Sequence, residues 1–260
     1  MIPVALTVAG SDPSGGAGLQ ADLKTFYNRG VYGMAVVSLL TVQNTRSVSS
    51  VLVLKGEQVA AQLDAVLEDI PPHAAKFGAL GNKEVIEHLS IRAKHFKFPL
   101  VIDPVMLSKH GEVLMASDAH EVIKKKLFPY ATLVTPNLQE AQDLSGITVA
   151  NLDDMKRAAQ KIAECGSKAV LIKGGHLSGE ATDLLWYEGK AELFKSERLP
   201  NKHTHGTGCT SSAVITAELA KGKPLPEAVR IAKDFITKAI DTGPNLGGGI
   251  GPVNHFVSLD

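Results

Sequence analysis

The chain alternates short, almost continuously apolar runs with longer segments in which apolar residues recur every three or four positions. Such a run is typical of a parallel strand covered on both faces, and the longer period is typical of a helix packed on a sheet. We therefore predict an α/β fold, with a mostly parallel central sheet flanked by helices on both faces. The expected strands are residues 4–9, 36–42, 75–80, 100–102, 132–135 and 169–172, and the expected helices are residues 17–28, 56–69, 83–94, 116–127, 137–145, 153–164 and 225–241.

The last part of the predicted sheet differs from the rest. Residues 184–187 and 191–195 flank the tripeptide Glu188-Gly189-Lys190, which predicts a small antiparallel hairpin at one sheet edge. No low-complexity linker, charge block or internal repeat divides the 260 residues, so we expect one domain over residues 1–260.

The composition argues against several kinds of partner. Lys and Arg number 27, as do Asp and Glu, and a net charge of zero gives no reason to expect nucleic acid or an anionic membrane. No uncharged apolar run reaches the roughly 18 residues of a membrane span, and the N-terminal apolar run lacks the basic region of a signal peptide. Cys165 and Cys209 are the two cysteines, which predicts a reducing, cytoplasmic location without a disulfide framework.

Glycine and polar residues follow nearly every predicted strand, at the place where each strand ends. Ligands of open α/β sheets bind beyond the carboxyl ends of the strands, so these residues predict a site at one edge of the sheet. They are residues 10–18, Gln43 with Asn44, residues 78–80, Asp103 with residues 104–106, Pro136 with Asn137 and Glu140, and Lys173 with residues 174–176.

Gly206, Thr207 and Gly208 form a glycine-rich turn that leads into an apolar helix. The free N–H groups and the dipole of a helix N-terminus favour an anion, and the same field would lower the pKa of Cys209 in the first turn. An anion cradle that holds an ionisable group suits phosphoryl transfer. Taken alone, this stretch is equally consistent with an ordinary loop followed by a small buried cysteine.

Asp103, Asn137 and Glu140 offer oxygen ligands of the kind that Mg²⁺ prefers beside phosphates. The alternative is structural, with Asn137 as an N-cap and Glu140 as its capping-box partner. Lys173 would place an ammonium group near the phosphates, and Gly174 and Gly175 would place open backbone there. The alternative is that Lys173 is only a solvated lysine before a turn.

Two other patterns have weak functional interpretations. Residues 16–21 fit the G-x-G-x-x-A dinucleotide pattern, but the acidic partner about 20 residues on is missing; we expect backbone that closes over a small ligand, with Asp22 able to bond it. His203 and His205 could indicate a metal site or a Cys–His hydrolase. Their spacing fits no common zinc pattern and no third ligand is evident, so we favour neither.

Seven segments along the whole chain match one known family. They are A-G-S-D-P-S-G-G-A-G-L-Q-A-D-L-K, T-V-Q-N-T, D-P-V-M, T-P-N-L-x-E-A, K-G-G-H, G-T-G-C-T and G-x-G-x-G-P-V-N-H. On these segments the chain resembles the hydroxymethylpyrimidine/phosphomethylpyrimidine kinases of thiamine biosynthesis, within the ribokinase-like superfamily. The resemblance implies a ribokinase-like fold, usually dimeric, that transfers the γ-phosphoryl group of ATP to 4-amino-5-hydroxymethyl-2-methylpyrimidine and then to its monophosphate.

The resemblance also implies roles by position. Gln43 and the backbone of Gly10 would hold the pyrimidine, with Asp22 nearby and Ala79 and Val105 in the same pocket. The nucleotide half would comprise an ATP-contacting set (Lys173, Gly175, Asn137 and Thr207), a set that organises Mg²⁺ mostly through water (Asp103, Asn137 and Glu140) and an anion hole (Gly206, Thr207 and Gly208). Cys209 would be the base, where sugar-kinase relatives have an aspartate. Residues 107–112, with Lys109 and His110, would form a flap that excludes water.

One position departs from the family pattern. The family usually reads K-x-G-M-L, whereas this chain reads K-F-G-A-L, so Ala79 replaces a thioether beside the ring site. This change concerns the selectivity of the pocket, and a pyridoxal kinase on the same scaffold is the alternative function. Some pyridoxal kinases pair the anion-hole cysteine with a second one in the flap, and the flap here has none. A nucleotide-binding regulatory module without catalysis is a third interpretation.

Overall fold

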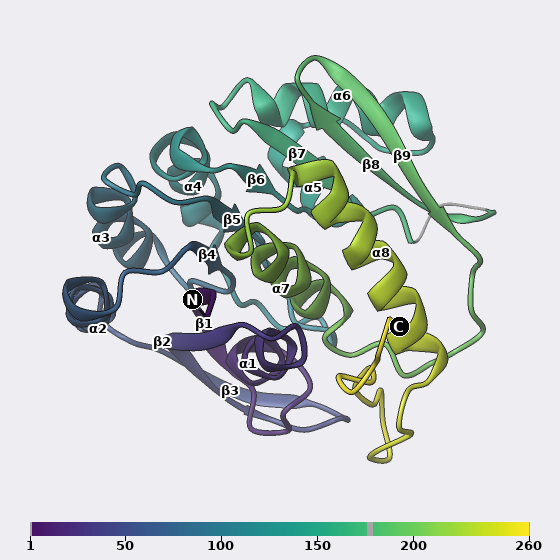
Figure 1. Cartoon of the computed structure of the whole chain (residues 1–260), viewed down its shortest axis with the longest axis horizontal. Helices are drawn as coiled ribbons and strands as arrows, with labels where there is room; N and C mark the ends of the chain where they lie inside the picture. Colours follow the sequence, from purple (N-terminus) through teal and green to yellow (C-terminus); the bar gives the residue numbers. More distant parts are fainter. Residues whose placement is uncertain (1, 176–178, 260) are drawn as a thin grey trace.

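The computed structural model describes residues 2–175 and 179–259, so His176 of the K-G-G-H segment lies outside the described residues. Within them, one nine-stranded sheet has the order β3-β2-β1-β4-β5-β6-β7-β8-β9 (Figure 1). The strands are β1 Val4–Ser11, β2 Tyr32–Gln43, β3 Val48–Val53, β4 Ala74–Phe77, β5 Leu100–Ile102, β6 Leu133–Val134, β7 Ala169–Ile172, β8 Ala181–Tyr187 and β9 Lys190–Ser196.

Strands β2, β1, β4, β5, β6 and β7 run parallel, and the expected antiparallel hairpin forms as β8 and β9 at one edge. The predicted sheet is therefore confirmed. Strand β3, which pairs antiparallel with β2 at the other edge, was not predicted. It reads V-S-S-V-L-V, and the exposed residues Ser49 and Ser50 interrupt the apolar run expected of a buried strand.

The helices are α1 Gly18–Asn28, α2 Gly56–Asp69, α3 Lys83–Ala93, α4 His120–Lys126, α5 Leu138–Ser145, α6 Leu152–Ala163, α7 Thr207–Ala220 and α8 Leu225–Asp241. The predicted helix 116–127 is a 3₁₀ turn, Ser117–Ala119, followed by α4, and a second 3₁₀ turn covers Phe128–Tyr130. Asparagine side chains cap α3, α5 and α6, because Asn82, Asn137 and Asn151 each accept a bond from a backbone N–H three residues on.

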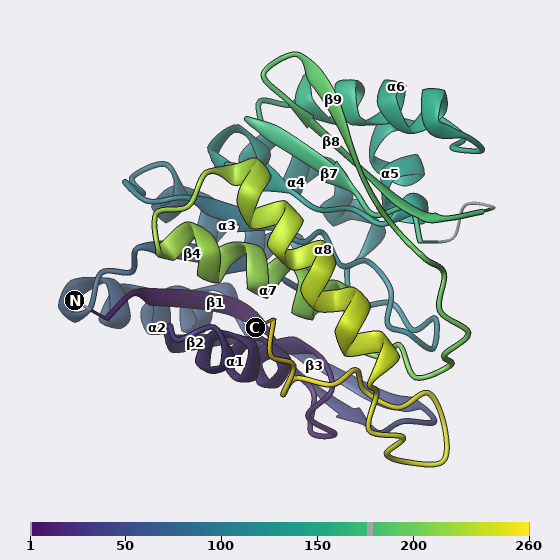
Figure 2. The ribbon, with the colours of Figure 1, turned by 45° about the vertical axis from the view of Figure 1, so that its right-hand side comes forward.

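The helices cover both faces of the sheet (Figures 1 and 2). α1, α7 and α8 build one hydrophobic core, and α2 to α6 build the other. Strand residues alternate between the two, so that Ala5 joins the first core and Leu6 the second. α7 is buried from Thr210 to Ala220 and packs on β1, β4 and β5, so its N-terminal turn lies at the carboxyl edge of the sheet.

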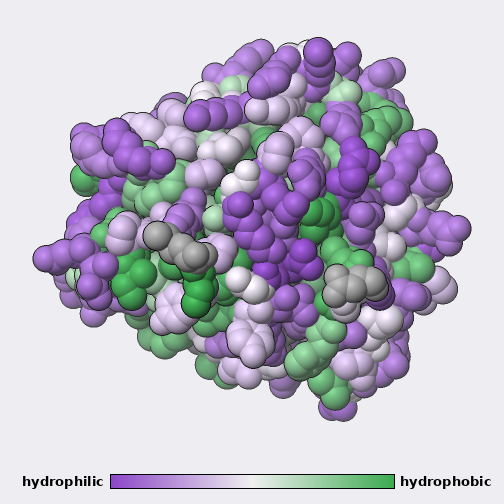
Figure 3. Space-filling view, viewed as in Figure 1, coloured by the Kyte–Doolittle hydropathy of each residue, from purple (hydrophilic) through white to green (hydrophobic). Residues whose placement is uncertain are grey.

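The face that carries α7 and α8 is mostly hydrophilic, with separate small hydrophobic patches (Figure 3). Among the described residues, every helix falls short of the length and apolar character that a membrane crossing demands.

Candidate active site

The turn that precedes α7 can be built only with glycine at its first position. Gly206 has φ +79°, and a Cβ there would lie 1.8 Å from the carbonyl oxygen of Gly16. The turn therefore packs directly on the glycine-rich loop between β1 and α1. The N–H groups of Gly208 and Cys209 in the first turn of α7 point out of the helix end at this junction, where they can bind an anion, whereas the N–H of Thr207 donates to the carbonyl of Thr204 at 3.3 Å. Gly206, Thr207 and Gly208 are the residues predicted to form the anion hole, and we keep that name for this turn below.

Cys209 lies in this first turn, partly buried, and its thiol accepts a hydrogen bond from the backbone N–H of Gly18. Burial raises the pKa of the Cys209 thiol to about 11; the ammonium of Lys76 opposes this rise, and the carboxylates of Asp22 and Asp103 add to it. The predicted lowering of this pKa is therefore wrong. The sequence shows the helix N-terminus but neither the burial nor the two acids, and these outweigh the helix dipole.

Lys76 is a residue of this site to which the sequence analysis gave no role. It is fully buried at the end of β4, with Nζ 2.5 Å from Oδ1 of Asp22 and 3.4 Å from the carbonyl oxygen of Cys209. Oδ2 of Asp22 accepts a bond of 2.7 Å from Thr7. Asp22 has no exposed surface, and its carboxylate binds Lys76. The sequence had led us to expect that Asp22 could bond a ligand, and this remains a prediction. A single lysine inside the apolar strand A-A-K-F was the available signal.

Lys173 reaches the anion hole from the end of β7. Its Nζ lies 2.8 Å from Oδ1 of Asp103, and it is so close to the turn that a Cβ on Gly208 would lie 3.2 Å from it. Thr135 and Ser212 also donate to Asp103, at 3.1 and 3.0 Å. Burial works against ionisation of Asp103, but Lys173 and Lys76 hold its pKa below the usual range. Lys173 and Asp103 therefore face the anion hole as an ion pair.

Asn137 and Glu140 form the capping box that was the structural alternative. Asn137 accepts from the backbone N–H of Glu140 at 2.9 Å, and Glu140 accepts from that of Asn137 at 2.7 Å. Glu140 is nonetheless buried beside Asp103 and Lys173. Burial raises its pKa to about 7, Asp103 adds to the rise and Lys173 opposes it. Within the described ranges, no group of three or more His, Cys, Asp and Glu side chains is arranged to hold a metal.

A cavity of about 340 Å³ opens beside the Lys173 end of the anion hole, between the β8–β9 hairpin and helices α7 and α8. Three of the four residues expected to contact ATP, namely Lys173, Gly175 and Thr207, line this cavity. Asn137 is next to them, because it forms an isolated bridge with Lys173. Among the described residues, no atom lies within 4 Å of a Cβ placed on Gly175, so no described side chain blocks that side of its backbone.

The residues expected to hold the acceptor lie at the ends of neighbouring strands. Gly10 is near the end of β1, Gln43 ends β2, and Ala79 and Val105 follow β4 and β5. The sheet order β2-β1-β4-β5 brings these four positions side by side at the carboxyl edge. The carbonyl of Ala79 accepts a bond from Ser38, and the Val105 N–H donates to the carbonyl of Asp103. The acceptor set therefore adjoins the anion hole on the side opposite the cavity.

The expected flap, residues 107–112, is a compact turn next to Val105. Leu107 pairs with Val113 in an isolated bridge, and Ser108 donates to the carboxylate of Glu112 at 2.6 Å. Burial lowers the pKa of Lys109. The flap therefore holds its own shape through local bonds.

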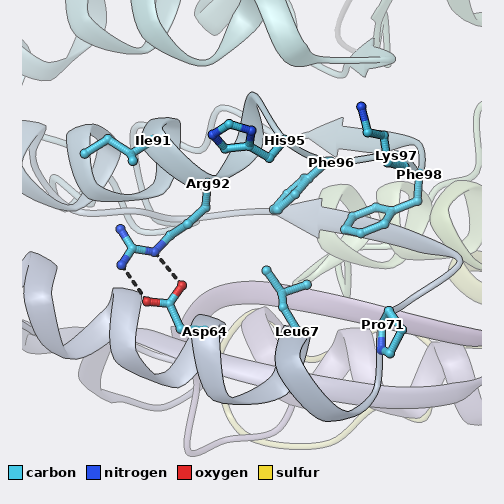
Figure 4. A pocket seen from close by; sticks show the side chains of 9 residues that line it. All are labelled: Asp64, Leu67, Pro71, Ile91, Arg92, His95, Phe96, Lys97 and Phe98. Carbon is cyan, nitrogen blue, oxygen red and sulfur yellow. Dashed lines mark hydrogen bonds and ion pairs between the residues drawn. The ribbon is translucent and has the colours of Figure 1, made fainter.

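A cavity of about 510 Å³ lies between α2 and α3 (Figure 4). The rings of Phe96 and Phe98 face Leu67 across it, and Arg92 binds Asp64 at its rim. α2 and α3 lead into β4 and β5, so this cavity lies near the amino ends of those strands, at the edge opposite the anion hole. Open α/β sheets bind ligands at the carboxyl ends, and we therefore place the chemistry at the anion hole despite the smaller cavity there.

A mostly parallel α/β sheet whose carboxyl edge joins a helix N-terminus, a lysine and a cavity lined by the residues expected to contact ATP has the features that a phosphotransferase needs. The sequence profile of the phosphomethylpyrimidine kinase family matches residues 12–254. A Streptomyces coelicolor protein named hydroxymethylpyrimidine/phosphomethylpyrimidine kinase is 47% identical over 257 residues, which cover 99% of this chain and 96% of that protein. The chain belongs to the phosphomethylpyrimidine kinase family and is a kinase.

Solved structures of two kinds of vitamin kinase share this fold. A phosphomethylpyrimidine kinase from Clostridium difficile has 45% identity and a TM-score of 0.82, over 92% of this chain and 99% of that chain. A Bacillus subtilis pyridoxal kinase, solved as an ADP complex, has 41% identity and a TM-score of 0.90, over 98% of each chain. Both kinds of kinase therefore have the ribokinase-like fold and use ATP, so neither feature distinguishes between their acceptors. The acceptor of this chain is inferred from the residues on the acceptor side of the site.

Proposed function

We propose that the chain is a single cytoplasmic kinase domain over residues 1–260 that phosphorylates 4-amino-5-hydroxymethyl-2-methylpyrimidine and then its monophosphate, in thiamine biosynthesis. The observation that carries this proposal is the placement of Gln43 at the carboxyl edge, next to the anion hole of a chain from the phosphomethylpyrimidine kinase family. An amide offers a donor and an acceptor together, which match the ring nitrogen and the amino group of an aminopyrimidine.

The nucleotide side of the site is proposed to stabilise the phosphoryl group in transfer. ATP would lie in the cavity bounded by Lys173, Gly175 and Thr207, with its γ-phosphate against the first turn of α7. Backbone N–H groups and the Lys173 ammonium then face the oxygens on which charge is greatest in the transition state. Gly206 and Gly208 admit this close approach because neither carries a side chain.

Cys209 is proposed to accept the proton of the acceptor hydroxyl. Its pKa of about 11 means that the thiol is mostly protonated at neutral pH, and that its thiolate is a strong base when it forms. Lys76 and the N–H of Gly18 favour the thiolate, and they supply the stabilisation that the base role requires. In the loose transition state of phosphoryl transfer, the acceptor hydroxyl has lost little of its proton. A small fraction of thiolate is therefore compatible with turnover.

Asp103 and Glu140 are proposed to hold Mg²⁺ through its water molecules. Both are buried acids beside Lys173. Burial raises the pKa of Glu140 to about 7, and a nearby cation would stabilise the charged form of this carboxyl group. The oxygens of Asp103 already accept from Lys173, Thr135 and Ser212, which favours contact through water. When bound, Mg²⁺ would supply positive charge that partly offsets the negative charge of the phosphate groups.

We further propose a homodimer formed through β2 and β3. Leu40 and Leu52 are paired across these two strands, and Val42 follows on the same face, and all three are exposed. Apolar residues gathered on one face of an edge hairpin are a usual site of self-association. Sedimentation equilibrium should give a dimer for the wild-type chain and a monomer for Leu52→Glu, and a monomeric wild type would refute the proposal.

Product analysis tests the proposed reaction. The enzyme is incubated with ATP, Mg²⁺ and hydroxymethylpyrimidine, and phosphorus NMR follows the monophosphate and then the diphosphate. Both products should form in sequence. A monophosphate that accumulates without a diphosphate would limit the function to the first step, and the absence of both would overturn it.

A further inference from the structure

His205 lies buried between three functional segments of the site. It is 3% exposed, and it directly precedes Gly206 of the anion hole. Its Nε2 is 2.7 Å from Oδ2 of Asp12 in the β1–α1 loop and 3.2 Å from the amide nitrogen position of Gln43 at the end of β2. Its Nδ1 is buried, with no hydrogen-bond partner in the described part of the chain.

Asp12 fixes which nitrogen of His205 carries a proton. Its carboxylate accepts bonds from the N–H and hydroxyl of Ser14 and from the N–H groups of Gly16 and Ala17. A carboxylate that accepts this many bonds is ionised. Asp12 therefore acts as an acceptor toward His205, and the short contact requires hydrogen on Nε2. Nδ1, which has no partner among the described residues, is then the unprotonated nitrogen, because a buried N–H without an acceptor would cost more free energy than a buried ring nitrogen without a donor.

This tautomer has a consequence for Gln43. A protonated Nε2 cannot accept a bond from an amide N–H, so the Gln43 atom that faces it is assigned as the carbonyl oxygen, which shares the Nε2 hydrogen with the carboxylate of Asp12 as the weaker acceptor. The oxygen and the nitrogen of a side-chain amide are told apart by their hydrogen-bond partners. The partner here is a donor, so the amide of Gln43 has its oxygen, and not its nitrogen, toward His205. The NH₂ group of Gln43 then points away from His205. One lone pair of the oxygen remains for a second donor.

We propose that His205, which Asp12 holds in place, is a positioning residue that sets the orientation of the Gln43 amide. The oriented amide in turn selects an aminopyrimidine, and this inference rests on the proposed pyrimidine kinase function. The oriented amide donates to a ring nitrogen and accepts from the neighbouring amino group. The backbone of His205 is itself fixed, because its N–H donates to Gly251 and its carbonyl accepts from Val253 of the C-terminal segment. The same residue thus ties the acceptor-recognition amide to the anion hole.

A matched pair of substitutions tests the role of Nε2. His205→Gln places an amide nitrogen close to the Nε2 position, so it keeps the donor, whereas His205→Asn stops short at the Nδ1 position. His205→Asn should raise the KM for hydroxymethylpyrimidine by about 10-fold, the scale expected when one buried hydrogen bond is lost. The KM for ATP should change less than twofold, and His205→Gln should remain close to wild type. Calorimetric titration of hydroxymethylpyrimidine into each variant measures the same loss without turnover.

A double-mutant cycle with Gln43→Leu separates positioning from a general structural role. If His205 acts through Gln43, His205→Asn should add nothing to the KM loss of Gln43→Leu. Additive losses, or an equal rise in the KM for ATP, would overturn the inference. Thermal unfolding checks that each variant is folded; if His205→Asn is not, Asp12→Asn replaces it in the same cycle. A wild type that neither binds nor phosphorylates hydroxymethylpyrimidine would refute the proposed function, whereas normal wild-type activity with an additive cycle would refute only the role of His205.

Discussion

The buried pair of Lys76 and Asp22 gives a prediction of defined size. The Asp22 carboxylate has no exposed surface, and its ionic partner is Nζ of Lys76 at 2.5 Å. Lys76→Met removes this partner and leaves the buried carboxylate unpaired. Removal of one member of a buried ion pair costs about 3–5 kcal/mol, because the remaining charge is uncompensated. We expect Lys76→Met to lower the free energy of unfolding by about that amount in urea titrations near pH 8. The double variant Lys76→Met, Asp22→Asn should recover most of the loss, because no buried charge remains.

The pH dependence of this loss follows from the sign of the pKa shift. Burial raises the pKa of Asp22, and without Lys76 the pKa has to rise further. A carboxyl group with a raised pKa in the folded state binds a proton more readily there than in the unfolded chain. Its contribution to stability is therefore lost as pH rises from the ordinary value of 3.8 through the raised one. Lys76→Met should thus be less destabilised at pH 5 than at pH 8, and the double variant should lack this difference. A single variant that loses less than about 1 kcal/mol, or a double variant no more stable than the single, would refute the reasoning.

Three further predictions concern catalysis. Cys209→Ala should lower kcat by about 10²-fold or more with little change in the KM for ATP, and near-normal turnover would exclude the base role. Because burial raises the pKa of Cys209 to about 11, the thiolate fraction grows with pH, so the wild-type kcat should rise between about pH 7 and 9; an equal rise in Cys209→Ala would assign it to another group. Glu140→Gln should raise the Mg²⁺ concentration that gives half-maximal rate, and an unchanged Mg²⁺ dependence would leave Glu140 as a capping residue only.

The elements that the sequence predicted well are those with a continuous local signal. Strands β5 and β7 and helices α2 and α8 have the predicted bounds, because each is either fully apolar or strictly periodic. β3 was missed because it is held by pairing with β2, whereas its own sequence, V-S-S-V-L-V, has two adjacent serines within a short apolar run. The convergence of Gln43, Asp103, Lys173 and the anion hole followed from their positions after strands, since parallel strands share one carboxyl edge.

The electrostatics of the site could not be predicted in this way. Lys76 and Asp22 are 54 residues apart and meet only in the folded chain. The pKa of Cys209 depends on that meeting and on burial, so a local reading of the helix N-terminus gave the wrong sign. His205 was considered only as a metal ligand or hydrolase residue, because its partners Asp12 and Gln43 come from distant segments.

Acceptor selectivity is the most direct test of the central claim. A coupled ADP-release assay compares kcat/KM for hydroxymethylpyrimidine and pyridoxal, with the wild type and Gln43→Leu measured in parallel. The wild type should prefer the pyrimidine, with pyridoxal as a weak side substrate admitted partly by the space at Ala79. Gln43→Leu should reduce kcat/KM for the pyrimidine far more than for pyridoxal, because a site that leaves polar groups unpaired discriminates by up to about 10⁴-fold. A wild-type preference for pyridoxal, or equal losses on both substrates in Gln43→Leu, would contradict the account.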